Sequence, residues 1–93
     1  MKLDKTRRGK FWISGQLIME RPEDYRVVMS DVLIVRAEMH HARDAIEYDG
    51  FCDAFDELAE GDELPFYEAQ ITKTCVDTLA GIIETTHKWV RVK

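Results

Sequence analysis

The chain has 93 residues, of which 45% are hydrophobic and 33% are charged, and its formal net charge is -5. This length provides one hydrophobic core, so we expect residues 1–93 to form a single small globular domain. The composition excludes a disordered chain, and no apolar run approaches the roughly 20 residues of a membrane-spanning helix. The two cysteines have no metal-binding or redox spacing, and the N-terminus lacks the apolar core of a signal peptide. Both features indicate a reducing, cytoplasmic setting.

Charge is distributed unevenly along the chain. The first ten residues contain five basic side chains and one acid, and the last seven residues add three basic side chains. Between these ends, residues 44–72 contain ten carboxylates and no Lys or Arg. We therefore expect a basic N-terminal arm over about residues 1–9. We also expect the basic ends to contact the acidic middle, either within one chain or between two copies.

The first predicted elements are a strand and a helix. Residues 10–20 are rich in aromatic and β-branched side chains and predict a strand, within which Gly15 predicts a bulge. Pro22 suits the first position of a helix, and the two acids that follow it suit the first turn. The sequence therefore predicts a helix that begins at Pro22.

Residues 25–50 allow two interpretations. Apolar side chains that recur every three or four positions fit one long helix ending near Gly50. Alternatively, a short helix ends near Ser30, and two strands at 32–41 and 45–51 form a hairpin through a turn at 42–44. We favour the hairpin, because the run at 32–35 has the composition of a buried strand. Its inward-facing residues would be Val35, Ala37, Met39, His41, Ile46 and Tyr48.

In the second half of the chain, residues 51–60 predict a short amphipathic helix that ends at Gly61. Residues 66–73 predict a strand, whereas residues 74–92 fit either a helix or a strand. These elements together predict an α+β fold, with a small, mostly antiparallel sheet and one or two packed helices. An all-α helical bundle is the alternative.

The acidic segment is the first candidate binding surface. Carboxylates along one face of the predicted helix would lie about 5–6 Å apart, comparable to the spacing of phosphates along a nucleic-acid strand. Such a row fits the basic groove of a nucleic-acid-binding protein, although a solvated, solubilising surface would have the same composition. The residues predicted to bind a partner are Asp53, Asp56, Glu57, Glu60, Asp62 and Glu63.

A second candidate site combines Glu38, His40 and Glu47. In a strand Glu38 and His40 share a face, and a hairpin register that places Glu47 opposite His40 would bring all three together. Two carboxylates and an imidazole can hold a divalent metal or act as a general acid–base pair. Because the same residues also suit an ordinary surface ion pair, we expect no metal or cofactor and keep a small metal- or ligand-binding enzyme as an alternative.

No other residues form a motif specific for catalysis. Cys52 and Cys75 would need a neighbouring base to act as nucleophiles, and we expect both to be buried and reduced. Ser14 stands in the sequence Ile-Ser-Gly-Gln, which differs from the G-x-S-x-G nucleophile motif. No catalytic residue is predicted.

Short runs in the acidic half carry a resemblance to known proteins. They are Ile46-Glu47-Tyr48, Phe55-Asp56-Glu57, Gly61 and Pro65-Phe66-Tyr67-Glu68. These runs resemble short uncharacterised proteins of tailed phages and prophages. The resemblance implies the cytoplasm of a bacterium or of a phage-infected host, and a small accessory protein that binds a host protein.

We therefore expect a non-enzymatic, acidic protein that binds a basic surface on another protein. One form of this hypothesis is a phage-type inhibitor that occupies the nucleic-acid-binding site of a host or defence protein. Direct binding of nucleic acid or a membrane is not expected. A structural homo-oligomer, with basic termini docked on acidic middles, is a further alternative.

Overall fold

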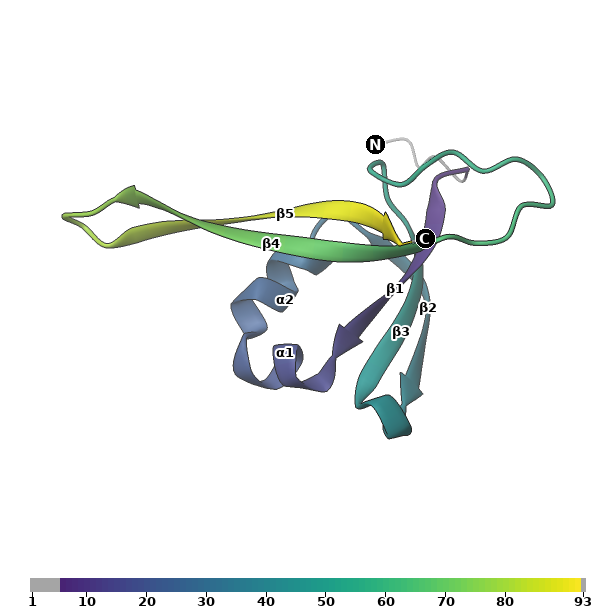
Figure 1. Ribbon diagram of the computed structural model, residues 1–93, viewed down its shortest axis with the longest axis horizontal. Coiled ribbons are helices and arrows are strands. Elements are labelled where there is room, and N and C mark those ends of the chain that lie inside the picture. Colours follow the sequence, from purple (N-terminus) through teal and green to yellow (C-terminus); the bar gives the residue numbers. More distant parts are fainter. Residues whose placement is uncertain (1–5, 93) are drawn as a thin grey trace.

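One five-stranded sheet and two short helices form the part of the chain that the computed structural model describes, residues 6–92 (Figure 1). Its elements are β1 (Arg8–Ser14), α1 (Gly15–Glu20), α2 (Pro22–Met29), β2 (Leu33–His40), a 3-10 helix (His41–Arg43), β3 (Ala45–Phe51), β4 (Phe66–Asp77) and β5 (Ile82–Val92). The strand order is β2-β3-β1-β4-β5. The predicted α+β class is confirmed, and the alternative of an all-α bundle is wrong.

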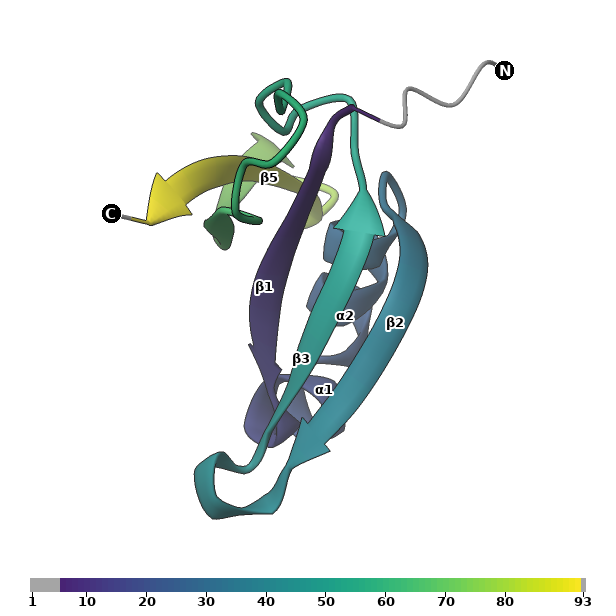
Figure 2. The same ribbon diagram turned by 90° about the vertical axis from the view of Figure 1, so that its right-hand side faces the viewer.

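The sheet consists of two antiparallel parts joined by a short parallel seam. β3 pairs antiparallel with both β1 and β2, and β4 pairs antiparallel with β5. The parallel seam between β1 and β4 has two residue pairs, Lys10 with Phe66 and Phe11 with Tyr67. Both helices lie on one face of the sheet, behind β1, β3 and β2 in Figure 2. The opposite face of these three strands is called the outer face below.

β1 ends earlier than the sequence predicts, because Ser14 caps a helix. Its Oγ accepts a hydrogen bond from the amide of Leu17 at 3.1 Å, which satisfies a free donor of the first helical turn. The strand predicted for residues 10–20 therefore stops at Ser14, and Gly15 begins α1 instead of forming a bulge. A Cβ atom at this position would lie 2.7 Å from the carboxylate of Asp44, so a larger residue would have to displace that exposed side chain.

The N-terminal arm differs from the prediction where the structure describes it. Residues 1–5 lie outside the described residues. Arg8 is already the first residue of β1, and the carbonyl oxygens of Thr6 and Arg7 accept hydrogen bonds from the loop after β3. Thr6, Arg7 and Arg8 therefore belong to the folded domain.

α2 begins at Pro22 as predicted and packs on the sheet through Val28, which has no exposed surface. Asp24, in the first turn of α2, is 2% exposed. Its carboxylate forms ion pairs with Arg21 and with Lys73 of β4, the latter at 3.2 Å. A charge can be buried at this position because two cations and the helix N-terminus surround it.

The β2–β3 hairpin confirms the favoured interpretation of residues 25–50, and the long helix is wrong. The chain reverses through the 3-10 helix and Asp44, whose φ of 47° is left-handed. Tyr48 is buried as expected. Four other predicted core positions are wrong. Val35, Ala37 and Met39 lie in the edge strand β2, which pairs with β3 alone, and all three are exposed, whereas His41 lies in the 3-10 helix.

The helix predicted for residues 51–60 is absent; β3 runs to Phe51, and an irregular loop continues from Cys52 to Pro65. Hydrogen bonds to distant segments replace the helical ones. The amides of Cys52 and Leu58 donate to the carbonyl oxygens of Arg7 and Thr6, at 3.0 and 2.9 Å. The amide of Asp56 donates to the hydroxyl of Tyr67 at 2.8 Å. These contacts hold the loop against β1 and β4 and prevent a regular helix.

β4 and β5 form a long hairpin. Residues 74–92, for which the sequence allowed a helix or a strand, therefore belong to two strands and the turn between them. Gly81 occupies the turn with a φ of 67°, a conformation that favours glycine. The far half of the hairpin, residues 73–85, extends beyond the helices and is called the arm below (Figure 1). The arm accounts for the elongated shape, whose longest dimension is 52 Å.

The core lies where β1, β3, the loop and the near half of β4–β5 meet. The rings of Phe55 and Tyr67 stack with centroids 4.2 Å apart, and Trp89 meets Phe11 at 4.8 Å. The buried cluster comprises Phe11, Ile13, Val28, Tyr48, Cys52, Phe55, Tyr67 and Trp89. Among residues 6–92, neither helix has the length and apolar composition that would allow it to cross a membrane.

Candidate functional site

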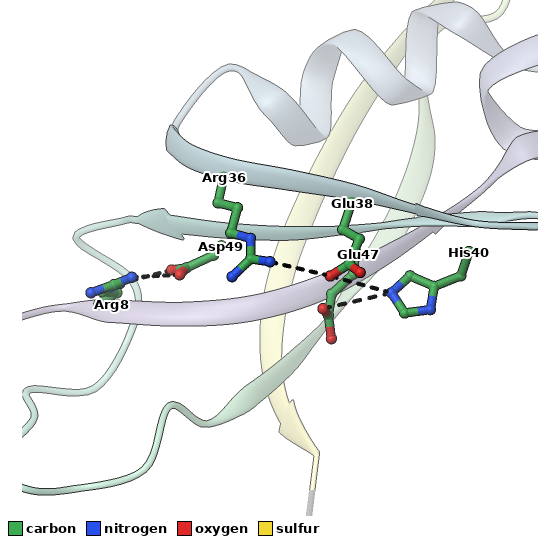
Figure 3. A network of polar contacts seen from close by, with 6 residues as sticks. All are labelled: Arg8, Arg36, Glu38, His40, Glu47 and Asp49. Atoms are coloured by element: carbon green, nitrogen blue, oxygen red, sulfur yellow. Dashed lines mark hydrogen bonds and ion pairs between the residues drawn. The ribbon is translucent and has the colours of Figure 1, made fainter.

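The outer face of β2, β3 and β1 carries a network of charged side chains, and Figure 3 shows six of them. Strand alternation places them there, because the intervening residues Phe11, Ile13 and Tyr48 face the core. The network comprises Arg36, Glu38 and His40 from β2, Glu47 and Asp49 from β3, and Arg8 from β1.

Glu38, His40 and Glu47 form the centre of this network. The Nε2 atom of His40 lies 3.9 Å from Oε2 of Glu38 and 3.8 Å from Oε2 of Glu47. One nitrogen or oxygen atom from each of the three side chains lies within 4.8 Å of the others. Figure 3 shows all three side chains directed toward one another. This set is called the Glu–His–Glu cluster below.

The predicted register of the hairpin is wrong by two residues, although the three side chains still meet. Glu47 is paired with Glu38, and His40 is paired with Ala45. Glu47 therefore reaches His40 diagonally across the strands, a distance that long side chains can span. The bulge of the β2–β3 ladder lies between Ile34 and Arg36 and leaves this end of the hairpin regular.

An aromatic contact fixes the imidazole of His40. The ring of Trp12 meets it edge-on with centroids 4.5 Å apart, and the guanidinium of Arg43 lies over the Trp12 ring at 5.0 Å. The Nε2 atom is shielded from solvent and has no hydrogen-bond partner among residues 6–92. A buried nitrogen atom without a hydrogen-bond partner costs free energy, so a structural role alone does not explain this position of the imidazole.

Cations flank the cluster on one side. The guanidinium of Arg36 lies 3.6 Å from the carboxylate of Glu38. Arg8 donates two hydrogen bonds to Asp49, at 2.8 and 2.5 Å, and this contact raises the pKa of Arg8. The bidentate contact holds the guanidinium of Arg8 against Asp49, whereas the contact between Arg36 and Glu38 is longer and more exposed.

Two hollows adjoin the cluster. A polar hollow of about 270 Å³ is lined by Arg8, Lys10, Arg36, Glu38, Glu47, Asp49 and Leu64. A larger hollow of about 640 Å³ is lined by Trp12, Arg43, Phe66, Tyr67, Glu68 and Val92. Two members of the cluster, Glu38 and Glu47, line the polar hollow, and the larger hollow has aromatic surface beside Trp12.

Sequence reasoning missed the roles of Trp12 and Arg43 at this site. Trp12 stands two residues after Lys10 in a strand, and this spacing places both on the face of Glu47. The alternation of side chains along this strand could therefore have predicted that Trp12 lies on the same face as Glu47. Arg43 carried no comparable signal, because its position depends on the geometry of the 3-10 helix.

The predicted acidic binding residues are exposed, but they do not form a row. They follow the irregular loop, so the regular spacing expected of a helix face is lost. Asp56 pairs with Arg91 at 3.2 Å, and Asp62 accepts a hydrogen bond from the amide of Ala59 at 2.9 Å. Within residues 6–92, no cation pairs with the other predicted acids: Asp53, Glu57, Glu60, Asp62 and Glu63.

The two cysteines differ in their environments. Cys52 is buried as expected, and burial raises the pKa of its thiol to about 11, which disfavours the reactive thiolate. Cys75 lies in the arm and is exposed, contrary to expectation.

Comparison with known proteins gives no family assignment. No family model matches the chain, and no curated protein or solved structure matches it. The arrangement of the side chains is therefore the basis for a functional proposal.

Proposed function

We propose that the protein binds a divalent metal ion at the Glu–His–Glu cluster. The observation that carries this proposal is the convergence of ligand atoms from two neighbouring strands: the shielded Nε2 of His40, which has no hydrogen-bond partner among residues 6–92, and one carboxylate oxygen each of Glu38 and Glu47. Carboxylates placed directly opposite each other, as Glu38 and Glu47 are, repel one another. A bound cation would relieve this repulsion and provide the missing partner of His40.

The distances support this proposal. Zinc lies about 2.1 Å from imidazole nitrogen and carboxylate oxygen, so two ligands in a tetrahedral arrangement are about 3.4 Å apart. The two distances from Nε2 of His40 to the carboxylates are 3.8 and 3.9 Å. All three ligand atoms lie within 4.8 Å of one another, so rotations of both the Glu38 and the Glu47 side chains would bring them to the distances that an ion requires.

The ligand types favour a particular class of ion. Imidazole suits zinc and other transition metals, whereas magnesium and calcium prefer sites made entirely of oxygen atoms. One nitrogen and two carboxylates therefore favour Zn²⁺ or Mn²⁺. Three protein ligands leave a coordination position open, and this position would face the polar hollow.

Metal binding is tested by calorimetric titration and by thermal unfolding with Zn²⁺, Mn²⁺ and Mg²⁺. A Cys75→Ser background removes the exposed thiol, which would otherwise bind zinc. We expect saturable binding of Zn²⁺ or Mn²⁺, with a stabilisation of about 2.7 kcal/mol at a hundred times the Kd. His40→Ala and Glu47→Gln should abolish both effects.

The matched control is His41→Ala, because His41 is the adjacent, exposed histidine outside the cluster. This variant should bind the metal as the parent does. Equal loss of binding in His40→Ala and His41→Ala, or binding that His40→Ala retains, would contradict the proposal.

A second proposed function is binding of a basic protein surface by the acidic loop. It is supported by the exposure of Asp53, Asp56, Glu57, Glu60, Asp62 and Glu63, most of which lack a cationic partner within residues 6–92. An inhibitor that occupies a nucleic-acid-binding site of a host or defence protein is one form of this function. The loop would act through concentrated charge, since it lacks the regular spacing of phosphates.

The test compares proteins captured from a bacterial lysate by the tagged parent and by Glu57→Lys/Glu60→Lys. A partner bound through the loop should elute with high salt, compete with single-stranded DNA and be lost in the double variant. Glu20→Lys in α1 is the control for charge, since Glu20 is exposed and distant in sequence. A partner retained by the double variant would exclude the loop as its binding site.

A further inference from the structure

β5 is an open edge of the sheet with the properties of a pairing strand. In the part of the chain that the structure describes, β5 pairs with β4 alone. It runs for 11 residues without a proline. Figure 1 shows it along the whole length of the hairpin. Natural edges are usually shortened, bulged or otherwise protected against pairing with another chain. The opposite edge, β2, is shorter and carries the bulge at Ile34 and Arg36. In β5 the bulge of the ladder lies on the partner strand β4, between Cys75 and Asp77, and charged side chains such as Lys88 are the remaining protection.

The arm adds apolar surface to this edge. Leu79 at its tip is fully exposed, and three further apolar side chains, Val76, Ile82 and Ile83, are more than half exposed. A two-stranded ribbon without a covering layer is marginally stable in water. The arm extends past α1 and α2, so the helices of its own chain do not cover it (Figure 1).

We propose that β5 pairs antiparallel with β5 of a second copy of this chain, with the two-fold axis at Thr86. This arrangement places Thr86 opposite itself and Glu84 opposite Lys88 of the second copy, twice by symmetry. It also places Ile82 opposite Val90 of the second copy. Every opposed pair on this face is then a favourable type: hydroxyl with hydroxyl, acid with base and apolar with apolar.

The charges of β5 select this register. Glu84 and Lys88 are both exposed, and neither has an ion-pair partner among residues 6–92. A slip of the axis by one residue toward Thr85 places Lys88 opposite Ile82, and a slip toward His87 places Glu84 opposite Val90. Each slip therefore leaves a charge beside an apolar side chain and loses both ion pairs.

The paired arrangement also gives the arm a surface to contact. Because the strands are antiparallel, the arm of each copy runs beside the near half of β5 in the other copy. Ile83 would lie beside Trp89 of the second copy, on the face that carries the helices. The contact uses the same surface on both copies, so it closes as a two-fold dimer with one continuous ten-stranded sheet.

The first test is the dissociation constant of the full chain, measured by sedimentation over a range of concentrations. The parent should form a concentration-dependent dimer. Glu84→Lys and Lys88→Glu should each raise the dissociation constant about tenfold, because each creates two like-charged pairs. The charge exchange Glu84→Lys/Lys88→Glu should restore the affinity of the parent.

Glu63→Lys, which changes the same charge in the loop, is the control and should leave the dimer intact. A monomeric parent at all concentrations would overturn the proposal. Equal dissociation in the exchanged variant and in the single variants would do the same. Because β5 and the Glu–His–Glu cluster lie in different parts of the sheet, His40→Ala should not change dimerisation.

A second test fixes the register. Thr86→Cys in a Cys75→Ser background should form a disulfide-linked dimer on mild oxidation, because opposed Cβ atoms lie about 4.5–5.5 Å apart and a small shift brings them to the roughly 3.5–4.5 Å that a disulfide needs. Glu84→Cys in the same background should cross-link much less, since it faces Lys88 of the second copy. Equal cross-linking at both positions would overturn the proposed axis.

Discussion

Asp24 constrains the packing of α2 through its buried charge. Its carboxylate is 2% exposed, yet it has ion-pair partners in two elements: Arg21 before the helix and Lys73 in β4. A buried charge is tolerated when partners surround it, and it becomes strongly destabilising when they are removed. Asp24 therefore joins α2 to the beginning of the arm through charge as well as through packing.

We predict that Arg21→Ala/Lys73→Ala lowers the free energy of unfolding by about 3–5 kcal/mol, because it leaves the buried carboxylate of Asp24 without a cation. Lys73→Ala alone should have a smaller effect, since Arg21 still pairs with Asp24. Urea unfolding followed by circular dichroism measures both. Arg26→Ala is the control, because its pair with Glu23 is fully on the surface. Equal stability of all three variants would contradict the assigned role of Asp24.

At the scale of elements, the loop from Cys52 to Pro65 shows that tertiary contacts can override a helical pattern. The side chain of Phe55 is fully buried between Tyr67 and Trp89. The predicted amphipathic helix would instead have placed Phe55 on one apolar face, beside other apolar side chains of residues 51–60. In the structure the loop is positioned by ring stacking and by amides that donate to the segment before β1.

We predict that Phe55→Ala costs about 3–5 kcal/mol of unfolding free energy, the usual cost of removing a large buried ring. Hydrogen exchange of the amides of Cys52, Asp56 and Leu58 should accelerate more than exchange in β3, because their bonds depend on the position of the loop. Leu79→Ala is the control, since Leu79 is fully exposed. Unchanged exchange in the loop of Phe55→Ala would show that other contacts hold it.

The β2–β3 hairpin could be predicted from the sequence because its signals are local. The β-branched run at 32–35 and strand alternation placed Glu38 and His40 on one face with Glu47 nearby, so the cluster was foreseeable. The register was not, because it depends on the 3-10 helix and on the left-handed Asp44. The loop was mispredicted for the opposite reason. Its local pattern is helical, and only residues distant in sequence determine its conformation.

Across the whole molecule, the uneven charge of the chain is partly neutralised within one domain. Arg8 near the start pairs with Asp49, and Arg91 near the end pairs with Asp56. This agrees with the expectation that the basic ends contact the acidic middle. The proposed metal cluster and the proposed dimer edge lie in opposite halves of the sheet, on either side of β1. The two proposals can therefore be tested separately in one protein.

The two-pair seam between β1 and β4 has a consequence for the order of folding. Both hairpins, β2–β3 and β4–β5, join neighbouring segments and need little loop closure, whereas the seam joins Lys10 to Phe66 across more than half of the chain. We therefore expect the hairpins to form early and the seam to close last. The seam contributes few backbone hydrogen bonds, so side chains hold the two halves together once they meet: the aromatic rings of Phe11, Phe55 and Trp89, and the ion pair between Asp24 and Lys73.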